Sequence, residues 1–274
     1  MGKPCLEAKV RISGPCRLSG AASIVFFAFA LCLMPCLVAR AKAPAQDTQR
    51  IATRIPFVGC KSDGQMGPEE APDGKPRLLP VAKGAANRLA FYKAEEGPGV
   101  LAPRRWYCFG TYGSAGYNLY VSPHPINARS FFSSNAKGFM GPAIQLTLEF
   151  GGTSGRFGVA QIIARVFPAH RAFVRKVIKE GLEPPSEFPF GPYPKDKLNY
   201  ENSEIVEYQT PAGADGLGTR SWLQKNSEPI SGVAVLVGQT PDLLQLSMRL
   251  PRNMSDLKQD IIHQVERDAA QLDD

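Results

Sequence analysis

The residues of this sequence with the most specific chemistry are two cysteines, Cys60 and Cys108. The other four cysteines precede residue 41, in a leader segment described below: Cys5, Cys16, Cys32 and Cys36. In an oxidising compartment the two remaining thiols most simply pair, and closing a loop of about 49 residues stabilises a folded chain by roughly 3 to 4 kcal/mol. The sequence therefore predicts a Cys60–Cys108 disulfide.

A second chemistry for these residues is nucleophilic catalysis, with Cys108 as the nucleophile and His124 or His170 as its base. No protease signature surrounds Cys108, so the disulfide is the better interpretation. The histidines and carboxylates also lack the spacing of a metal site or of a paired acid and base. Ser114 lacks the spacing of a nucleophile elbow. We therefore assign no catalytic residue and no metal ligand from the sequence.

A glycine-rich run, GGTSGRFG at residues 151–158, has glycines at positions 152, 155 and 158. This spacing resembles the turn with which extended short-chain dehydrogenases hold a dinucleotide pyrophosphate at the start of a helix. However, the run lies deep in the chain, no regular alternation of strands and helices follows it, and no acidic residue ends a second strand about twenty residues later. We interpret the run as a tight strand-to-helix turn and expect no cofactor.

A run of positive charge is the third candidate, because residues 151–179 contain six Arg and Lys residues and no acidic residue. On a helix over residues 169–180, basic side chains lie opposite or beside an apolar stripe formed by Phe173 and Val177. Such a face is usually an ordinary solvated surface, and otherwise a docking patch for an anionic envelope polymer, a lipid headgroup or an acidic partner. The candidate anion-docking face consists of Arg171, Arg175, Lys176 and Lys179.

Patterns of apolar residues predict the elements that would position these groups. Expected strands cover residues 104–112 and 117–121 as a hairpin, 143–150, 205–208, and 232–237 and 244–250 as a second hairpin. Expected helices cover residues 81–95, 159–167, 168–180 and a C-terminal segment that begins near Asn253 or Ser255. Strands and helices cluster rather than alternate, which favours an α+β fold with a largely antiparallel sheet and packed helices.

The strand at 244–250 and the C-terminal helix carry the clearest patterns. Apolar residues at positions 244, 246, 248 and 250 alternate with Gln245, Ser247 and Arg249, which predicts one packed face and one face in solvent. The C-terminal helix has an apolar stripe that we expect to pack against the hairpin: Leu257, Ile261, Ile262, Val265 and Ala269.

An uncharged apolar segment from Gly20 to Ala39 follows a basic leader and precedes a small-residue site at 39–41. This arrangement is typical of an export signal, so residues 1–41 are expected to be a cleavable signal peptide. Retention of the segment as a membrane anchor is the alternative, because about 20 apolar residues can span a bilayer. In either case the bulk of the chain is expected to be periplasmic or secreted.

The remaining chain is expected to comprise an N-terminal α+β part with the disulfide (42–183), a proline-rich connector (184–198), and a C-terminal part of strands plus a helix (199–274). The two parts are compatible with one domain. Residues 1–41 hold five of the 32 Lys and Arg residues and one of the 25 Asp and Glu residues. The rest of the chain thus carries 27 basic and 24 acidic residues, a net charge of +3, which argues against nucleic-acid binding.

Three segments resemble a group of uncharacterised exported bacterial proteins. They are VGCKSDGQ at residues 58–65, WYCFGTYGS at residues 106–114, and the hairpin that begins with GVA at 232 and ends with RLP at 251. The resemblance covers nearly the whole chain after the leader and implies a bacterial origin. It carries no catalytic residue over to this sequence.

We therefore expect an exported, non-enzymatic binding or interaction module of the periplasm or envelope. Its expected partner is an anionic envelope component or an acidic protein, with membrane contact only through an uncleaved signal segment; the sequence does not specify an oligomeric state. The alternative is a hydrolase of a cell-wall or extracellular polymer, with its site near the hairpin at 107–120 and the loop at 59–80. A cleft lined by Asp63, Tyr112 and His124 within hydrogen-bonding reach would favour the hydrolase.

Overall fold

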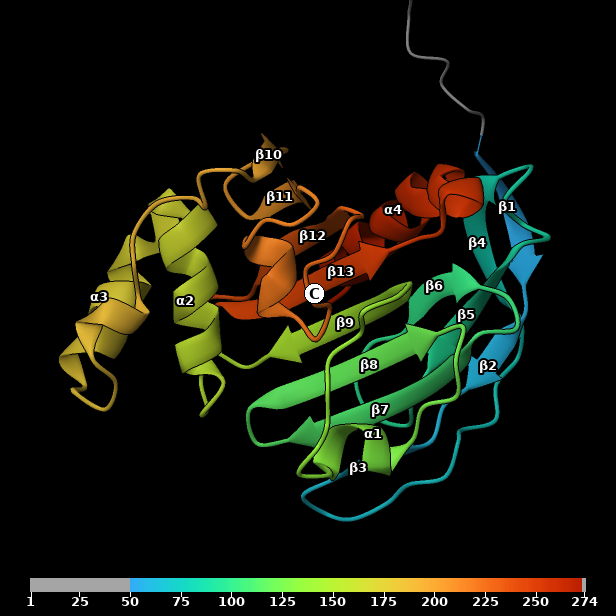
Figure 1. Ribbon diagram of the computed structural model, residues 1–274, viewed down its shortest axis with the longest axis horizontal. Helices are drawn as coiled ribbons and strands as arrows, with labels where there is room; N and C mark the ends of the chain where they lie inside the picture. Colours follow the sequence, from blue (N-terminus) through green and yellow to red (C-terminus); the bar gives the residue numbers. More distant parts are fainter. Residues whose placement is uncertain (1–49, 273–274) are drawn as a thin grey trace, which may run out of the picture. The chain divides into compact units, whose positions relative to one another are not determined.

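An eight-stranded sheet forms the centre of residues 50–272, the part of the chain that the computed structural model describes (Figure 1). Neighbouring strands are antiparallel except for the edge pair β3 and β7, which confirms the predicted α+β fold with a largely antiparallel sheet. The strand order is β10 (Lys197–Tyr200), β11 (Ile205–Thr210), β12 (Ile230–Val237), β13 (Asp242–Arg249), β9 (Ala143–Glu149), β8 (Gly116–Ser122), β7 (Tyr107–Gly113) and β3 (Ser62–Gly64).

Two smaller sheets are built from the N-terminal third of the described chain. One contains β2 (Phe57–Gly59), β5 (Leu89–Lys93) and β6 (Val100–Pro103), and the other pairs β1 (Arg50–Ile55) with β4 (Arg77–Ala82). The predicted helix over residues 81–95 is therefore wrong. Alanines spaced along this segment imitate the stripe of a helix, but Leu89 to Tyr92 are four consecutive buried residues, because β5 is covered on both faces.

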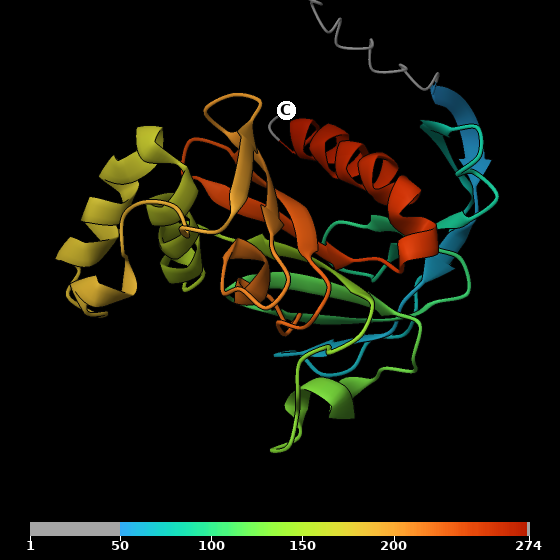
Figure 2. The same cartoon turned by 45° about the horizontal axis from the view of Figure 1, so that its top comes forward.

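Four α-helices complete the described fold: α1 (Ala128–Phe132), α2 (Arg156–Val166), α3 (Arg171–Lys179) and α4 (Lys258–Ala270). The C-terminal helix lies along one side of the large sheet (Figure 2). Every residue of its predicted apolar stripe is buried, in a core shared with β8, β9, β12 and β13, which confirms the predicted packing. No helix within residues 50–272 combines the length and the apolar character needed to cross a membrane.

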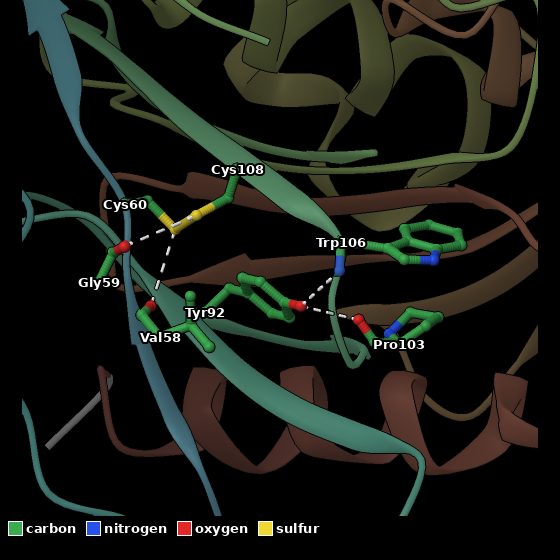
Figure 3. The surroundings of a disulfide bond; sticks show 7 residues. All are labelled: Val58, Gly59, Cys60, Tyr92, Pro103, Trp106 and Cys108. Atoms are coloured by element: carbon green, nitrogen blue, oxygen red, sulfur yellow. Dashed lines mark hydrogen bonds between the residues drawn. A yellow bond between two sulfur atoms is a disulfide. The ribbon is translucent and has the colours of Figure 1, made fainter. Parts of the chain in front are cut away.

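The disulfide between Cys60 and Cys108 is present, with 5.4 Å between the two Cα atoms, and confirms the pairing predicted from the sequence (Figure 3). Cys60 follows β2 of the three-stranded sheet, whereas Cys108 lies in β7 of the large sheet. Beside the bond, the buried hydroxyl of Tyr92 donates to Pro103 O at 2.8 Å and accepts from Trp106 N at 3.1 Å. The disulfide therefore joins two sheets that no strand pairing connects.

Residues 184–198 connect α3 to β10 within one compact unit that contains all the described residues. Pairing of β13 with β9 brings segments from before and after this connector into the same sheet. Phe188 of the connector is buried among side chains of α2 and α3. The expected signal peptide and its four cysteines lie outside the described residues.

The second face of the large sheet contradicts the prediction that Gln245, Ser247 and Arg249 meet solvent. Their exposed fractions are 8%, 1% and 2%. They are buried because residues 216–225, here called the strap, cross in front of β9 and β13 (Figure 1). Arg249 fixes this covering layer by donating to the carbonyl oxygens of residues 139–141 at 3.1 to 3.3 Å and to that of Gln224.

Candidate functional site

Polar side chains line up on the second face of the large sheet because three interior strands pair in register. Asn118 of β8 stands opposite Thr147 of β9, which stands opposite Gln245 of β13. Two residues along, Gln145 stands between Tyr120 and Ser247. Since alternate residues of a strand point to one face, these two rows form a polar patch at the middle of the sheet.

The patch is hollowed rather than filled. Two adjoining cavities of about 220 and 210 Å³ both have Asn118 and Glu149 in their walls. We call the combined hollow the polar groove. Its walls are formed by Thr111, Tyr112, Gly113, Ala115, Gly116, Tyr117, Asn118, Tyr120, Phe132, Gln145, Thr147, Leu148, Glu149, Arg220, Ser221, Trp222, Gln245 and Ser247.

The strap forms one wall of the polar groove and is anchored at its start and in its middle. At its start, Asp196 accepts from Leu217 N at 2.7 Å and from the Thr210 hydroxyl at 2.8 Å. In its middle, Trp222 N donates to the side-chain oxygen of Gln145 at 2.8 Å, and Trp222 O accepts from Phe139 N at 2.7 Å. These bonds hold Arg220, Ser221 and Trp222 over the sheet.

Part of the polar patch is internally satisfied. Gln145 Nε2 donates to Thr147 Oγ1 at 2.9 Å and to Asn118 Oδ1 at 3.2 Å, and the Thr147 hydroxyl donates to the same Asn118 oxygen at 2.7 Å. On the other side, the Tyr208 hydroxyl donates to Leu246 O at 2.7 Å and pairs with Ser247 Oγ at 2.6 Å. These groups are structural, because their hydrogen-bonding capacity is used within the fold.

Three groups of the polar groove remain open. Among the described residues, the Asn118 side-chain NH₂, the Gln245 side-chain oxygen and the Glu149 carboxyl have no hydrogen-bond partner. They come from three adjacent strands, β8, β9 and β13. None of these atoms is among the fully buried, unpaired side-chain atoms of the described residues, so they face the hollow where water or a ligand can pair with them.

Glu149 has the most perturbed environment of these groups. Burial disfavours its charged form and raises the pKa of the carboxyl to about 7, against the opposing effect of the positive charge of Arg220. Arg220 itself donates to the side chain of Gln161 on α2. Titratable groups whose pKa is moved toward neutrality by their surroundings are frequent at functional sites.

An aromatic cluster forms the end of the groove near β7 and β8. The rings of Tyr120 and Phe131 stack with their centroids 4.2 Å apart, and Trp222 meets Phe131 edge to face at 5.3 Å. Phe132, the next residue of α1, lines the groove while remaining 58% exposed. The groove thus combines polar groups along its floor with aromatic side chains at one end.

The glycine-rich run at 151–158 connects β9 to α2, which confirms the predicted strand-to-helix turn. Its last glycine has a specific neighbour: a Cβ added at Gly158 would lie 2.2 Å from a carboxyl oxygen of Glu149. A Cβ at Gly155 would lie 2.2 Å from Ala115 O. These glycines therefore permit close approach, and Gly158 makes room for the groove carboxyl beside the first turn of α2.

Replacing Gly158 with alanine is expected to push the Glu149 carboxyl away from α2 and into the groove, where more water reaches it. The pKa of Glu149 should then fall toward its ordinary value, as followed by a carboxyl NMR titration. The cost in stability should stay below about 1 kcal/mol, because a side-chain end can rotate and alanine favours a helix over glycine. Gly152→Ala is the control, since its Cβ would meet only Thr240, at 4.0 Å. The same titration curve for both variants would contradict this assignment.

The candidate anion-docking face lies on α3, where Val177 of the predicted stripe is buried together with Val174, and Phe173 is half-buried. Arg175, Lys176 and Lys179 are exposed and take part in none of the ion pairs within residues 50–272. Arg171 differs, because it is half-buried with its guanidinium 5.4 Å from the Phe190 ring centroid. Beside the helix is an open hollow of about 700 Å³ lined in part by Lys176, His170 and Gly152.

Of the three residues proposed for a hydrolase cleft, Asp63 and Tyr112 lie on the paired strands β3 and β7, but His124 is not brought to them. Tyr112 pairs with Tyr117 at the turn end of the β7–β8 hairpin, whereas His124 follows Ser122 at the opposite end. About five residues of strand, roughly 17 Å, separate these ends. Asp63 accepts from the backbone N of Gly64, and the Tyr112 hydroxyl donates to Gly67 O at 2.6 Å. Both polar groups thus serve the local loop.

A separate group of carboxylates could hold a cation. Glu201, Glu207 and Glu266 offer oxygen atoms that all lie within 4.8 Å of one another. Burial, reinforced by the other two carboxylates, raises the pKa of Glu266 to about 7. Oxygen donors of this kind suit a hard divalent cation such as Ca²⁺. Sequence reasoning missed this group because its members come from β11, the turn before it and α4.

Sequence reasoning also missed the residues of the polar groove. The available signal was the alternation in β9, where Gln145, Thr147 and Glu149 occupy every second position. The same alternation in β13 was interpreted as a solvent-facing side.

Comparison of the chain with protein-family models, curated proteins and solved structures finds no match. The function is therefore argued from the geometry of the groove.

Proposed function

We propose that this protein is an exported bacterial envelope protein that binds a small polar ligand in the polar groove without transforming it. The observation that carries the proposal is the convergence of three open polar groups, from Asn118, Glu149 and Gln245, on one hollow. Export is supported by the apolar leader segment and its small-residue site. The Cys60–Cys108 disulfide is consistent with an oxidising compartment.

Binding is favoured over hydrolysis by the chemistry of the groove walls. Glu149 is the one carboxyl among the described groove residues, whereas glycoside hydrolysis ordinarily uses two. The Ser221 hydroxyl donates to Gly218 O at 2.6 Å, and Ser247 is engaged by Tyr208, so neither stands beside a general base. A specific observation still favours the hydrolase as the second candidate: a carboxyl with a pKa of about 7 can act as a general acid.

The test uses residues 42–274, purified in oxidised form, and a small-molecule extract of bacterial envelopes. We expect the extract to raise the melting temperature of the wild-type protein and to leave Asn118→Asp unchanged, because this variant keeps the oxygen that accepts from Gln145 and Thr147 but loses the open NH₂ group. Asn199→Asp on the exposed strand β10 is the matched control and should respond as the wild type does.

Equal responses of the wild-type protein and Asn118→Asp would overturn the proposed site. Recovery of the bound compound, followed by mass spectrometry, separates the two functions. An unchanged compound supports a binding protein, whereas cleavage that Glu149→Gln abolishes would support the hydrolase.

We also propose that the exposed basic residues of α3 dock the protein on an anionic envelope component. The expected result is retention on an anionic polysaccharide matrix such as heparin–agarose, with elution by salt because exposed charges are screened. Neutralising Arg175, Lys176 and Lys179 to glutamine should lower the eluting salt concentration. The control neutralises three exposed lysines elsewhere, Lys75, Lys83 and Lys137. Equal elution of the two triple variants would exclude a dedicated face.

A further inference from the structure

The open groups of the polar groove differ in hydrogen-bonding character. The Asn118 NH₂ can only donate, and the Gln245 side-chain oxygen can only accept. Both lie in one row across β8, β9 and β13, with Thr147 between them. The Glu149 carboxyl accepts when ionised and also donates when protonated. A ligand that satisfies this row must therefore offer both acceptors and donors within a short distance.

This requirement discriminates between ligand classes. A carboxylate only accepts, so it would leave the Gln245 side-chain oxygen unsatisfied. An ammonium group only donates, so it would leave the Asn118 NH₂ unsatisfied. A hydroxyl group does both, and adjacent hydroxyls on one ring offer several such groups in fixed positions. Hydroxylated rings thus match the row better than singly charged ligands do.

The position of the groove argues against an extended peptide. Peptides commonly bind by adding a strand to an exposed sheet edge, where main-chain hydrogen bonds supply the affinity. The groove lies over the face of β8, β9 and β13, and each of these strands is already paired on both sides. The sheet edges at β3 and β10 are formed by other strands. Recognition in the groove must therefore come from side chains.

The aromatic end of the groove supplies the remaining contact. Tyr120 is only 3% exposed and supports the half-buried Trp222, so the aromatic surface that a ligand can reach is that of Trp222 and of Phe132, which is 58% exposed. Aromatic rings bury apolar surface effectively, and Tyr and Trp suit surfaces that are apolar on one side and wet on the other. A sugar ring has this mixed character, because its C–H bonds form apolar faces and its hydroxyls point outward.

We infer that the ligand of the polar groove is a neutral sugar residue, whose hydroxyls pair with Asn118, Glu149 and Gln245 and whose apolar face contacts the aromatic end. This inference rests on the proposed function, since it names the ligand class of the same groove. It requires no charge on the ligand and no chemical change in it.

The test is an NMR titration of the ¹⁵N-labelled, oxidised protein with defined probes. The neutral probes are cellobiose, maltose and N,N′-diacetylchitobiose, the anionic probe is digalacturonate, and the peptide probe is glycylglycine amide. We expect at least one neutral disaccharide to shift the side-chain NH₂ signal of Asn118 together with backbone signals of Thr147 and Gln245. Asn118→Asp should weaken that binding at least tenfold, whereas Asn199→Asp should leave it unchanged.

Shifts in the groove caused only by digalacturonate or by the peptide would overturn the sugar assignment, and so would the absence of a shift with every neutral probe. The envelope-extract experiment distinguishes this failure from failure of the proposed function. If the extract still stabilises the wild-type protein but not Asn118→Asp, the groove binds a ligand of another class. The mapping is made on the wild-type protein, so it does not depend on the folding of a variant.

Discussion

Replacing Glu149 with glutamine is expected to raise the free energy of unfolding at pH 8 by about 3 kcal/mol and to leave it nearly unchanged at pH 4. The pKa of Glu149 rises from an ordinary value of 4.5 to about 7 in the folded protein. The folded state therefore holds the proton more tightly than the unfolded state does, and stability falls as the pH rises from about 4.5 to 7. Each unit of difference corresponds to about 1.4 kcal/mol, and glutamine cannot lose a proton. Urea unfolding at pH 4, 6 and 8 measures the effect.

Glu266→Gln is the matched control for this experiment. The pKa of Glu266 is also raised to about 7, but it lies on α4, away from the groove residues. Its removal should also favour the folded state above pH 7, without changing the response to the envelope extract. If Glu149→Gln lowers stability at pH 8, the carboxyl contributes to the fold as an ion, and its assignment as an open group of the groove is wrong.

Removing the disulfide with the double variant Cys60→Ala and Cys108→Ala is expected to lower the free energy of unfolding by about 3 to 4 kcal/mol. The two cysteines are 48 positions apart, so the bond restricts a long loop of the unfolded chain. It also joins the three-stranded sheet to the large sheet, beside the pairing of β3 with β7 in which Ser62 stands opposite Gly110. Denaturant unfolding of the oxidised protein and of the variant measures the difference.

Reduced wild-type protein supplies the control for this loss. It should unfold at the same denaturant concentration as the double variant, because both lack only the cross-link. A thiol assay on the denatured protein 42–274 should find no free thiol before reduction and two afterwards. Two reactive thiols before reduction would contradict the disulfide, and an equal stability of the oxidised protein and the variant would contradict its structural role.

The disulfide was predictable from the number of cysteines, and most of the strands were predictable from residue patterns within short segments. Two cysteines after the leader left one simple pairing, and the alternation in 244–250 identified β13 and its pairing with β12. The helix wrongly expected at 81–95 shows where a local pattern fails. Buried residues in succession, such as Phe91 and Tyr92, fit a helix or a doubly covered strand, and only the neighbouring layers decide between them.

The polar groove could not be predicted for a related reason. The alternation in β9 and β13 showed which side chains share a face, but a polar face is usually exposed. Here that face is covered by the strap, which follows β9 by more than sixty residues. The strap is held in place by hydrogen bonds to Asp196 and Gln145, and these bonds cannot be inferred from the sequence alone. Whether this polar row is buried therefore depends on the tertiary structure and cannot be decided from the local sequence.

The bond between Cys60 and Cys108 also has a consequence for when an exported chain acquires its fold. Thiols stay reduced in the cytoplasm, so the chain there would lack about 3 to 4 kcal/mol out of a total that for most domains is only about 5 to 15 kcal/mol. A weakly folded chain is easier to thread through a secretion channel. Under the proposed export, oxidation after crossing would then fasten the two sheets together, so the timing of folding would depend on these two sulfur atoms.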